Sequence, residues 1–396
     1  MPARWPPLWL AAAATASGWA AVYSIGRWII LFASGPVHED VLMYYVAAET
    51  GLRYGWSHIY DQSMFRSAGT SFPAVAQVLD SHRPFASSPL LAWMFAPLTA
   101  FPEPIVYALW TLLSLGALVL AWRIASPYAG LARFTLLLLA IGLWPVLLAF
   151  YFGQPTLIVL ALVASAWWLC NKSKPVAAGG ALALATLLKP QVVVLIPAAL
   201  LFSGRYRAAG SWIIGCAILG LATALTLGTS GLFDWWHAVK EVQSLPVDTE
   251  YTLAHFFGTG PLTYGLWSIE GLTSLLIAWW RRRELEIVFA SGLLGTAATA
   301  SYFHDADYAI LVLAALLVLR TSPPKWHRLW LLAGVIAMQL MTYGAEPRGP
   351  IWDFATHASQ LIWDGTWLGI LAAGAFGAPT KPTRTRAVAG PTWRQE

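Results

Sequence analysis

The sequence predicts an all-α polytopic membrane protein, and three observations support this fold class. Of its 396 residues, 58% are hydrophobic and only 11% are charged, whereas soluble domains carry roughly 25% charged residues. Many uncharged stretches approach the ~20 residues that a helix needs to cross the hydrocarbon core of a bilayer. The 23 tryptophans and 14 tyrosines suit the two membrane–water interfaces, where amphipathic rings accumulate.

The apolar stretches predict about twelve transmembrane helices. The first stretch is too long for the hydrophobic region of a cleaved signal peptide, so we expect an uncleaved helix there. Lys189-Pro190 separates two short stretches, which form either two helices or one broken helix. The expected spans are 8–33, 104–122, 132–150, 155–170, 176–188, 191–203, 209–229, 262–280, 285–303, 308–320, 327–344 and 354–377.

Charge distribution predicts the orientation, because basic residues collect in cytoplasmic loops. With a cytoplasmic N-terminus, 17 of the 24 Lys and Arg residues fall in inner loops or in the C-terminal tail. By contrast, 14 of the 19 acidic residues fall in outer loops or at outer helix ends. The net charge of +5 therefore reflects topology, and we expect no nucleic-acid partner. One transmembrane domain is expected over 1–380, followed by a basic cytoplasmic tail over 381–396.

Two long outer loops, 34–103 and 230–261, are expected to carry the functional face. The first contains HEDVLMYYVAAETGLRYGWSHIYD, whose mixture of aromatic, small and charged residues suits helices that lie along the interface. Its last part, 87–101, is apolar but too short to cross a bilayer comfortably. We expect this part to enter the membrane and return, although a full crossing of 87–101, or of the 176–203 pair, stays open.

Asp40 is the first candidate for chemistry, because it follows the outer end of the first helix and precedes Tyr44 and Tyr45. Charged groups at membrane depth cost several kcal/mol unless they are paired or hydrated. A carboxylate in a pocket between lipid and water can act as a general base. The alternative is a solvated charge that marks the helix end.

Lys189 and Gln154 are candidates for donor binding. Pro190 frees backbone carbonyl groups, which is tolerated where the chain lines a cavity, and the Lys189 ammonium suits a phosphate. The alternative is a lysine that snorkels from a helix end. Gly153 permits close backbone approach, and the Gln154 amide can bind a sugar hydroxyl. The plainer interpretation of this Gly-Gln pair is a helix start.

The segment SYFHDAD places His304, Asp305 and Asp307 between two expected spans. They suit a divalent metal, a phosphate-binding imidazole or a solvated turn, and we expect no metal. Arg83 is a further phosphate candidate, because arginine pairs bidentately with phosphate. Glu270 and Asp364 fall inside expected spans without an identified partner, and we interpret them as packing residues or as errors in the span boundaries.

The order of these motifs resembles glycosyltransferase family 87. DVLMYYVAAETG and IYD come first, then an apolar segment that begins at a proline, FGQPTLIVL, LLKPQVVVL and a late His-Asp, over most of residues 1–320. The resemblance implies a GT-C fold and a polyprenyl-phosphate sugar as donor. It implies that Asp40 is the catalytic base and that His304 handles the donor, and it matches Gly153-Gln154 and Lys189-Pro190 to family motifs. One departure is FASSP, where the family often has Tyr-Pro-Pro.

The resemblance implies a sugar transfer, most consistent with mannose, to a lipid or glycan acceptor at the outer face of the cell membrane. Asp40 would deprotonate the acceptor hydroxyl, and a single displacement would invert the anomeric carbon. Lys189, His304 and Arg83 would stabilise the departing phosphate, and Gln154, Tyr44 and Tyr45 would contact the donor. No cofactor is expected besides the donor substrate.

Two other functions remain open at this point. In a transporter or lipid flippase, Lys189, Glu270 and Asp364 would line the pathway. In a polymer ligase that uses a diphosphate carrier, we would expect basic residues to concentrate in one late outer loop, but 230–261 holds Lys240 alone as a basic residue. The long first outer loop favours the glycosyltransferase, because a carrier does not need it.

Overall fold

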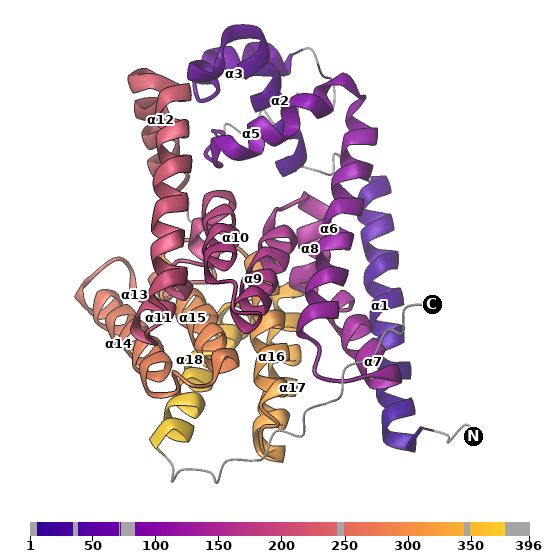
Figure 1. Ribbon diagram of the computed structural model, residues 1–396. Coiled ribbons are helices and arrows are strands. Elements are labelled where there is room, and N and C mark those ends of the chain that lie inside the picture. The colour runs from indigo at the N-terminus through magenta and orange to yellow at the C-terminus, as the bar shows by residue number, and fades with distance from the viewer. Residues whose placement is uncertain are drawn as a thin grey trace, which may run out of the picture.

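The computed structural model describes residues 6–34, 39–70, 72, 84–243, 249–343 and 349–376, and all regular structure in these ranges is helical. The predicted all-α class is therefore confirmed. Figure 1 shows a small helical layer above a larger helical bundle, with one long helix, α12, reaching from the bundle to the layer.

The upper layer comes from the segment 34–103, which the sequence predicts to be the first outer loop. It contains α2 (Glu39–Tyr54), η1 (Trp56–His58), α3 (Gln62–Gly69), α5 (Pro89–Phe95) and η2 (Ala96–Ala100). Side chains fix where two of these helices begin. Asp61 accepts hydrogen bonds from the backbone N–H groups of Ser63 and Met64, and Ser88 accepts one from Leu90 N–H, so both act as N-caps.

The bundle contains a helix at every expected span. Its elements are α1 (Leu8–Ser34), α6 (Glu103–Ala125), α7 (Gly130–Ile141), α8 (Trp144–Phe152), α9 (Thr156–Asn171), α10 (Pro175–Leu188), η3 (Pro190–Val192), α11 (Leu195–Phe202), α12 (Tyr206–Gln243), α13 (Leu253–Phe257), α14 (Pro261–Trp280), α15 (Leu285–Ala298), η5 (Asp305–Ile310), α16 (Leu311–Arg320), α17 (Lys325–Leu340), η6 (Met341–Tyr343) and α18 (Pro350–Phe376).

Three of the described helices, α1, α6 and α12, are long and apolar enough to cross a membrane. A fourth span results if α7 and α8, which are bent by 60° at a short break, count as one. The count of about twelve spans stays a prediction, because most other apolar helices are shorter than a full crossing. The expected end of the span 209–229 coincides with a kink in α12, because Gly228 has a φ of 66° and a second helical stretch continues from there to Gln243.

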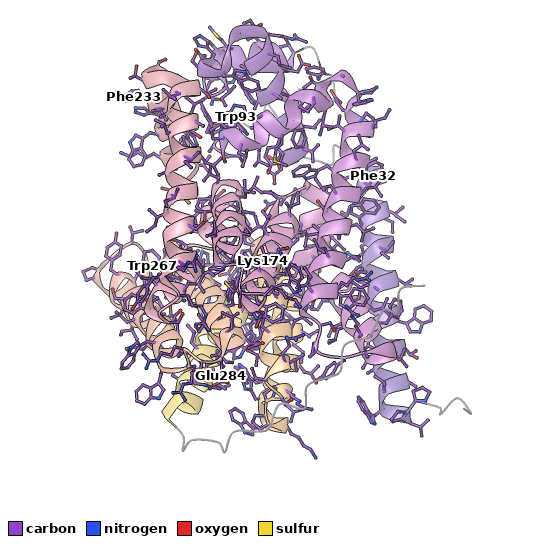
Figure 2. The ribbon with its side chains drawn as sticks, in the orientation of Figure 1. Phe32, Trp93, Lys174, Phe233, Trp267 and Glu284 are labelled. Carbon is purple, nitrogen blue, oxygen red and sulfur yellow. The ribbon has the colours of Figure 1, made fainter. Side chains whose placement is uncertain are left out.

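The bundle carries large apolar side chains on its outside, as expected for contact with lipid. Ile218 and Leu225 on α12 are 62% and 76% exposed, and Ile269 on α14 is 62% exposed. Figure 2 labels two further exposed side chains, Phe32 on α1 and Phe233 on α12, at opposite edges of the molecule. Soluble monomers rarely expose apolar patches of this extent.

The interior is packed through small residues instead. Helix α15 is buried along almost its whole length. A Cβ atom at Gly292 would lie 2.9 Å from the Ile196 Cα atom, and one at Gly295 would lie 2.4 Å from the Ser274 side chain. Close approach of helices through small residues is typical of membrane bundles.

Candidate active site

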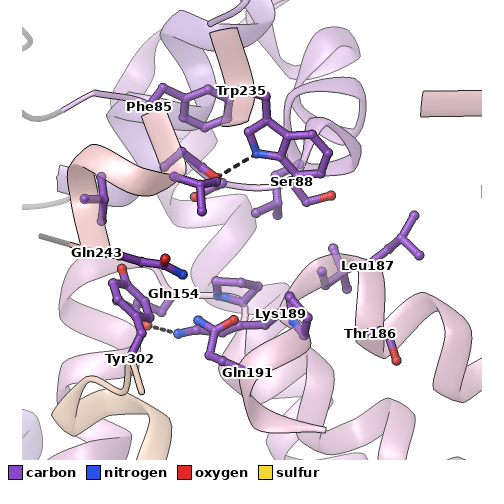
Figure 3. A pocket seen from close by; sticks show the side chains of 18 of the residues that line it. Phe85, Ser88, Gln154, Thr186, Leu187, Lys189, Gln191, Trp235, Gln243 and Tyr302 are labelled. Carbon is purple, nitrogen blue, oxygen red and sulfur yellow. Dashed lines mark hydrogen bonds between the residues drawn. The ribbon is translucent and has the colours of Figure 1, made fainter. Parts of the chain in front are cut away.

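A cavity of about 840 Å3 is lined by residues of both the upper layer and the bundle. Its wall includes the candidates Asp40, Tyr44, Gln154, Lys189 and His304. These residues come from α2, the α8–α9 turn, the α10–η3 turn and the segment before η5, so the fold unites stretches that lie more than 250 residues apart. Figure 3 shows Gln154, Lys189 and Tyr302 close together in the lower part of this cavity.

Asp40 lies in the first turn of α2, where the helix dipole favours a carboxylate. Burial raises the pKa of this carboxyl group to about 7, while the nearby Lys189 ammonium opposes the shift and Glu39 adds to it. A carboxyl group whose pKa lies near neutrality can take a proton at physiological pH and release it again. The arrangement therefore suits a general base.

Gln154 reaches Asp40 because of the glycine before it. Gly153 ends α8 with a φ of 73°, and a Cβ atom there would lie 2.1 Å from the Val41 side chain. The Trp110 indole N–H donates a 2.7 Å hydrogen bond to the Gly153 carbonyl oxygen. The Gln154 side chain then lies near Asp40, where it opposes the rise of the Asp40 pKa. The close backbone approach that Gly153 permits is therefore present, and the plainer interpretation of a helix start also holds, because α9 begins at Thr156.

Lys189 lies at the centre of a buried network of hydrogen bonds and one ion pair. Its ammonium donates to the Gln154 side-chain oxygen and to Thr156 Oγ1, the latter at 3.0 Å, and it forms an ion pair with Asp307. Thr156 Oγ1 also donates to Asp307 Oδ1 at 3.1 Å. An ammonium group has three donor hydrogens, and here each has a protein partner. The Lys189 charge is thus balanced within the fold, and its contact with a donor phosphate stays a prediction.

His304 immediately precedes η5, at its N-cap position. Its Nε2 atom lies 2.8 Å from the Tyr302 hydroxyl oxygen, and its backbone N–H donates to Asp307 Oδ2 at 3.2 Å. One carboxylate oxygen of Asp307 therefore faces Lys189, and the other accepts a hydrogen bond at the start of η5. Among the described residues, His304, Asp305 and Asp307 do not form a metal-type cluster, whereas another set does. The ion pair with Lys189 engages Asp307, and the expectation that these three residues hold no metal stays a prediction.

Asp305 does not line the cavity. Its Oδ1 atom accepts a 2.8 Å hydrogen bond from the Ala306 N–H, and burial raises the pKa of the carboxyl group to about 7.

Among the described residues, Tyr45 does not join the site. The Tyr45 hydroxyl lies 3.2 Å from the carbonyl oxygens of both Thr99 and Phe101, so the side chain contacts η2 and is absent from the cavity wall. Neighbouring positions on a helix point in different directions, which explains why Tyr44 reaches the cavity and Tyr45 does not. Arg83 lies outside the described residues.

Sequence reasoning missed several wall residues. Tyr302 and Gln191 lie within the recognised segments SYFHDAD and LLKPQVVVL, and Gln243 and Trp235 belong to the part of α12 that follows the kink at Gly228. The Trp235 indole N–H donates a 3.1 Å hydrogen bond to the Ala86 carbonyl oxygen, drawn as a dashed line in Figure 3. The FASSP segment therefore forms part of the wall, because α12 anchors it there.

Glu270 and Asp364 lie well inside α14 and α18, so neither marks the end of a helix, and the interpretation as span-boundary errors stays untested. Asp364 is completely buried. A Cβ atom built on the adjacent Gly365 would lie 3.3 Å from Glu270 Oε1. Neither carboxylate oxygen of Asp364 has a hydrogen-bond partner among the described residues.

Comparison with known proteins supports a family assignment. No curated protein and no solved structure matches the chain. The family model of glycosyltransferase family 87 matches residues 85–342, which is more than half of the chain. The match begins after α2, so the assignment of Asp40 rests on the geometry of the cavity and on the motif resemblance. Together with the long apolar helices, this match establishes that the chain belongs to glycosyltransferase family 87 and is a membrane glycosyltransferase.

Proposed function

We propose that this enzyme transfers a sugar, with mannose as the first candidate, from a polyprenyl-phosphate donor to a lipid or glycan acceptor. The observation that carries the proposal is the composition of one cavity. Asp40, Gln154 and His304 lie on its wall together with the apolar side chains of Leu187, Val194, Leu232, Trp236 and Val239. A donor with a charged head and a hydrocarbon tail needs both kinds of surface.

In the proposed reaction, Asp40 accepts the proton of the acceptor hydroxyl. The acceptor oxygen bonds to the anomeric carbon while the bond to the phosphate oxygen breaks on the opposite face, so the configuration inverts. The bonding electrons leave with the polyprenyl phosphate, which needs no proton from a general acid. One carboxylate therefore suffices, unlike the pair that glycoside hydrolysis uses.

The developing charge on the phosphate needs donors and positive charge nearby. The His304 imidazole, which lies beside the Tyr302 hydroxyl, is the proposed donor. Lys189 contributes the field of its ammonium and also fixes Gln154, which in turn orients Asp40. Lys189 is thus proposed to act mainly as a positioning residue.

The proposal includes a topology in which about twelve helices cross the membrane, both termini are cytoplasmic and the cavity opens at the outer surface. Support comes from the basic inner turns, such as Arg281, Arg282 and Arg283 after α14. A lipid-linked donor then has its head group at the level of Asp40 and its tail along the bundle.

The test is transfer by membranes that contain the wild type, Asp40→Asn or Glu49→Gln. Glu49 is the matched control, because it lies on the same helix but pairs with Arg53 at the surface. The donors are radiolabelled polyprenyl-phosphate mannose, glucose and arabinose, with a polyprenyl-diphosphate sugar and a nucleotide sugar for comparison.

We expect labelled product from a polyprenyl-phosphate sugar, a loss of roughly 10²–10⁴-fold in Asp40→Asn, and normal transfer in Glu49→Gln. Transfer from the diphosphate or nucleotide donor alone would overturn the donor class. Near-normal turnover of Asp40→Asn would remove Asp40 from the role of base.

A further inference from the structure

A second cluster of ligand-type side chains lies outside the cavity, where α13 meets the start of α18. His255 on α13 and Asp353 and His357 on α18 each offer one ligand atom, and these atoms lie within 4.8 Å of one another. Glu250, just before α13, approaches the same place, with its Oε2 atom 3.8 Å from His357 Nε2. The cluster joins two parts of the chain that are about a hundred residues apart.

The orientation of His357 points to a ligand. Its side chain is 3% exposed, and its Nδ1 atom lies 3.0 Å from the Asp353 backbone oxygen and 3.0 Å from the Asp353 Oδ1 atom, which leaves Asp353 Oδ2 for a ligand. A carbonyl oxygen can only accept a hydrogen bond, so Nδ1 carries the hydrogen and the neutral ring has its lone pair on Nε2. That Nε2 atom is buried and has no hydrogen-bond partner in the described part of the chain. Histidines that bind metals commonly donate their other N–H to a carbonyl or carboxylate in this way.

We propose that His357, His255 and Asp353 hold a structural zinc ion, with Glu250 placed to complete the coordination. Two imidazoles and carboxylates form a mixed nitrogen and oxygen set that zinc accepts. Zinc bonds of about 2.0–2.1 Å place tetrahedral ligand atoms ~3.3 Å apart. The distances are longer here: 3.9 Å between His255 Nε2 and Asp353 Oδ2, 3.8 Å between His357 Nε2 and Glu250 Oε2, and up to 4.8 Å within the cluster of three. Side-chain movements toward the ion close the site.

The zinc ion links Glu250 and α13, which belong to the second long loop, to α18. Tyr251 lies between the cluster and η5, because its ring centroid is 5.0 Å from that of His357 and its carbonyl oxygen accepts a 3.1 Å hydrogen bond from the Tyr308 hydroxyl. Tyr308 belongs to η5, which also carries Asp307, the partner of Lys189. Zinc at this place stabilises the fold next to the site without touching substrate.

The test measures zinc bound to the full chain, purified in detergent without a histidine tag, stripped with chelator and dialysed against micromolar zinc. His357→Gln removes the buried ligand, and His255→Gln removes an exposed one whose loss leaves the core intact. His237→Gln is the matched control, since His237 is an exposed histidine on α12 outside the cluster.

We expect about one zinc ion per chain in the wild type and in His237→Gln, and loss of this ion in both other variants. Added zinc should raise the melting temperature of the wild type and of the control but not that of His255→Gln, because a ligand that binds the folded state stabilises it. Zinc bound equally by all four proteins, or by none, would overturn the proposal. Neither result depends on transferase activity.

Discussion

Asp307 in η5 and Asp364 in α18 are both completely buried, yet their surroundings differ. Asp307 forms an ion pair with Lys189, accepts a hydrogen bond from Thr156, and accepts another from the backbone of His304. Asp364 lies close to Glu270, and neither of its oxygens has a hydrogen-bond partner among the described residues. Asp307 belongs to the polar network around Lys189, which extends to Asp40. Asp364 does not belong to this network. Burial of a charged side chain therefore does not by itself identify a functional residue; its partners do.

The largest effect on stability is expected from Lys189→Met. It leaves Asp307 buried without its cation, and breaking one side of a buried pair costs about 3–5 kcal/mol in the free energy of unfolding. Thermal or denaturant unfolding of the purified protein measures this loss. The exposed pair of Arg53 and Glu49 provides the control, because Arg53→Met should cost only about 0–1 kcal/mol. Much of the stability should return in Lys189→Met/Asp307→Leu, and equal losses in the single and double variants would contradict the pairing.

Gly153→Ala should weaken both the fold and the reaction. The left-handed backbone costs roughly 1–2 kcal/mol for alanine, and the new Cβ atom would also lie 2.1 Å from Val41, beside Asp40. Gly204→Ala has the same backbone cost at a φ of 83° but meets nothing within 4 Å. Unfolding and transfer assays should therefore find a smaller loss of stability and normal activity in Gly204→Ala. Equal activity in the two variants would show that Gly153 does not position the site.

The reaction should depend on pH through Asp40. Below a pKa of about 7 the base is protonated and inactive, so kcat/KM should rise about tenfold per pH unit and then level off above it. Because Glu39 raises this pKa, Glu39→Gln should move the midpoint to lower pH. Glu49→Gln should leave the midpoint in place. A kcat/KM that stays constant from about pH 5 to about pH 8 would exclude Asp40 as the titrating base.

The smallest effect is expected from Asp364→Leu. A buried polar group without partners costs about 1–3 kcal/mol, so leucine should raise the melting temperature and leave transfer intact. The matched change Asp307→Leu should lower both the melting temperature and the rate of sugar transfer. If Asp364→Leu abolished transfer while the protein stayed folded, the contrast between the two buried acids would fail.

The wall of the site was predictable where it depended on local sequence. Asp40 at a helix start, the glycine before Gln154 and the proline after Lys189 each have a local physical reason that short segments reveal. The surroundings of Lys189, Tyr45 and the His304–Asp305–Asp307 set could not be predicted from the sequence, because they depend on which side chains meet across the bundle. The roles expected for these residues stay predictions.

Composition and the order of motifs by themselves determined that this chain is a helical membrane protein and pointed to its family, because apolar length and local turns do not depend on distant contacts. Tertiary structure decided that Asp307 neutralises Lys189, that α12 brings Trp235 to the FASSP segment, and that His255 meets His357. These pairings depend on how helices pack, and packing is set by many weak contacts between residues far apart in the chain.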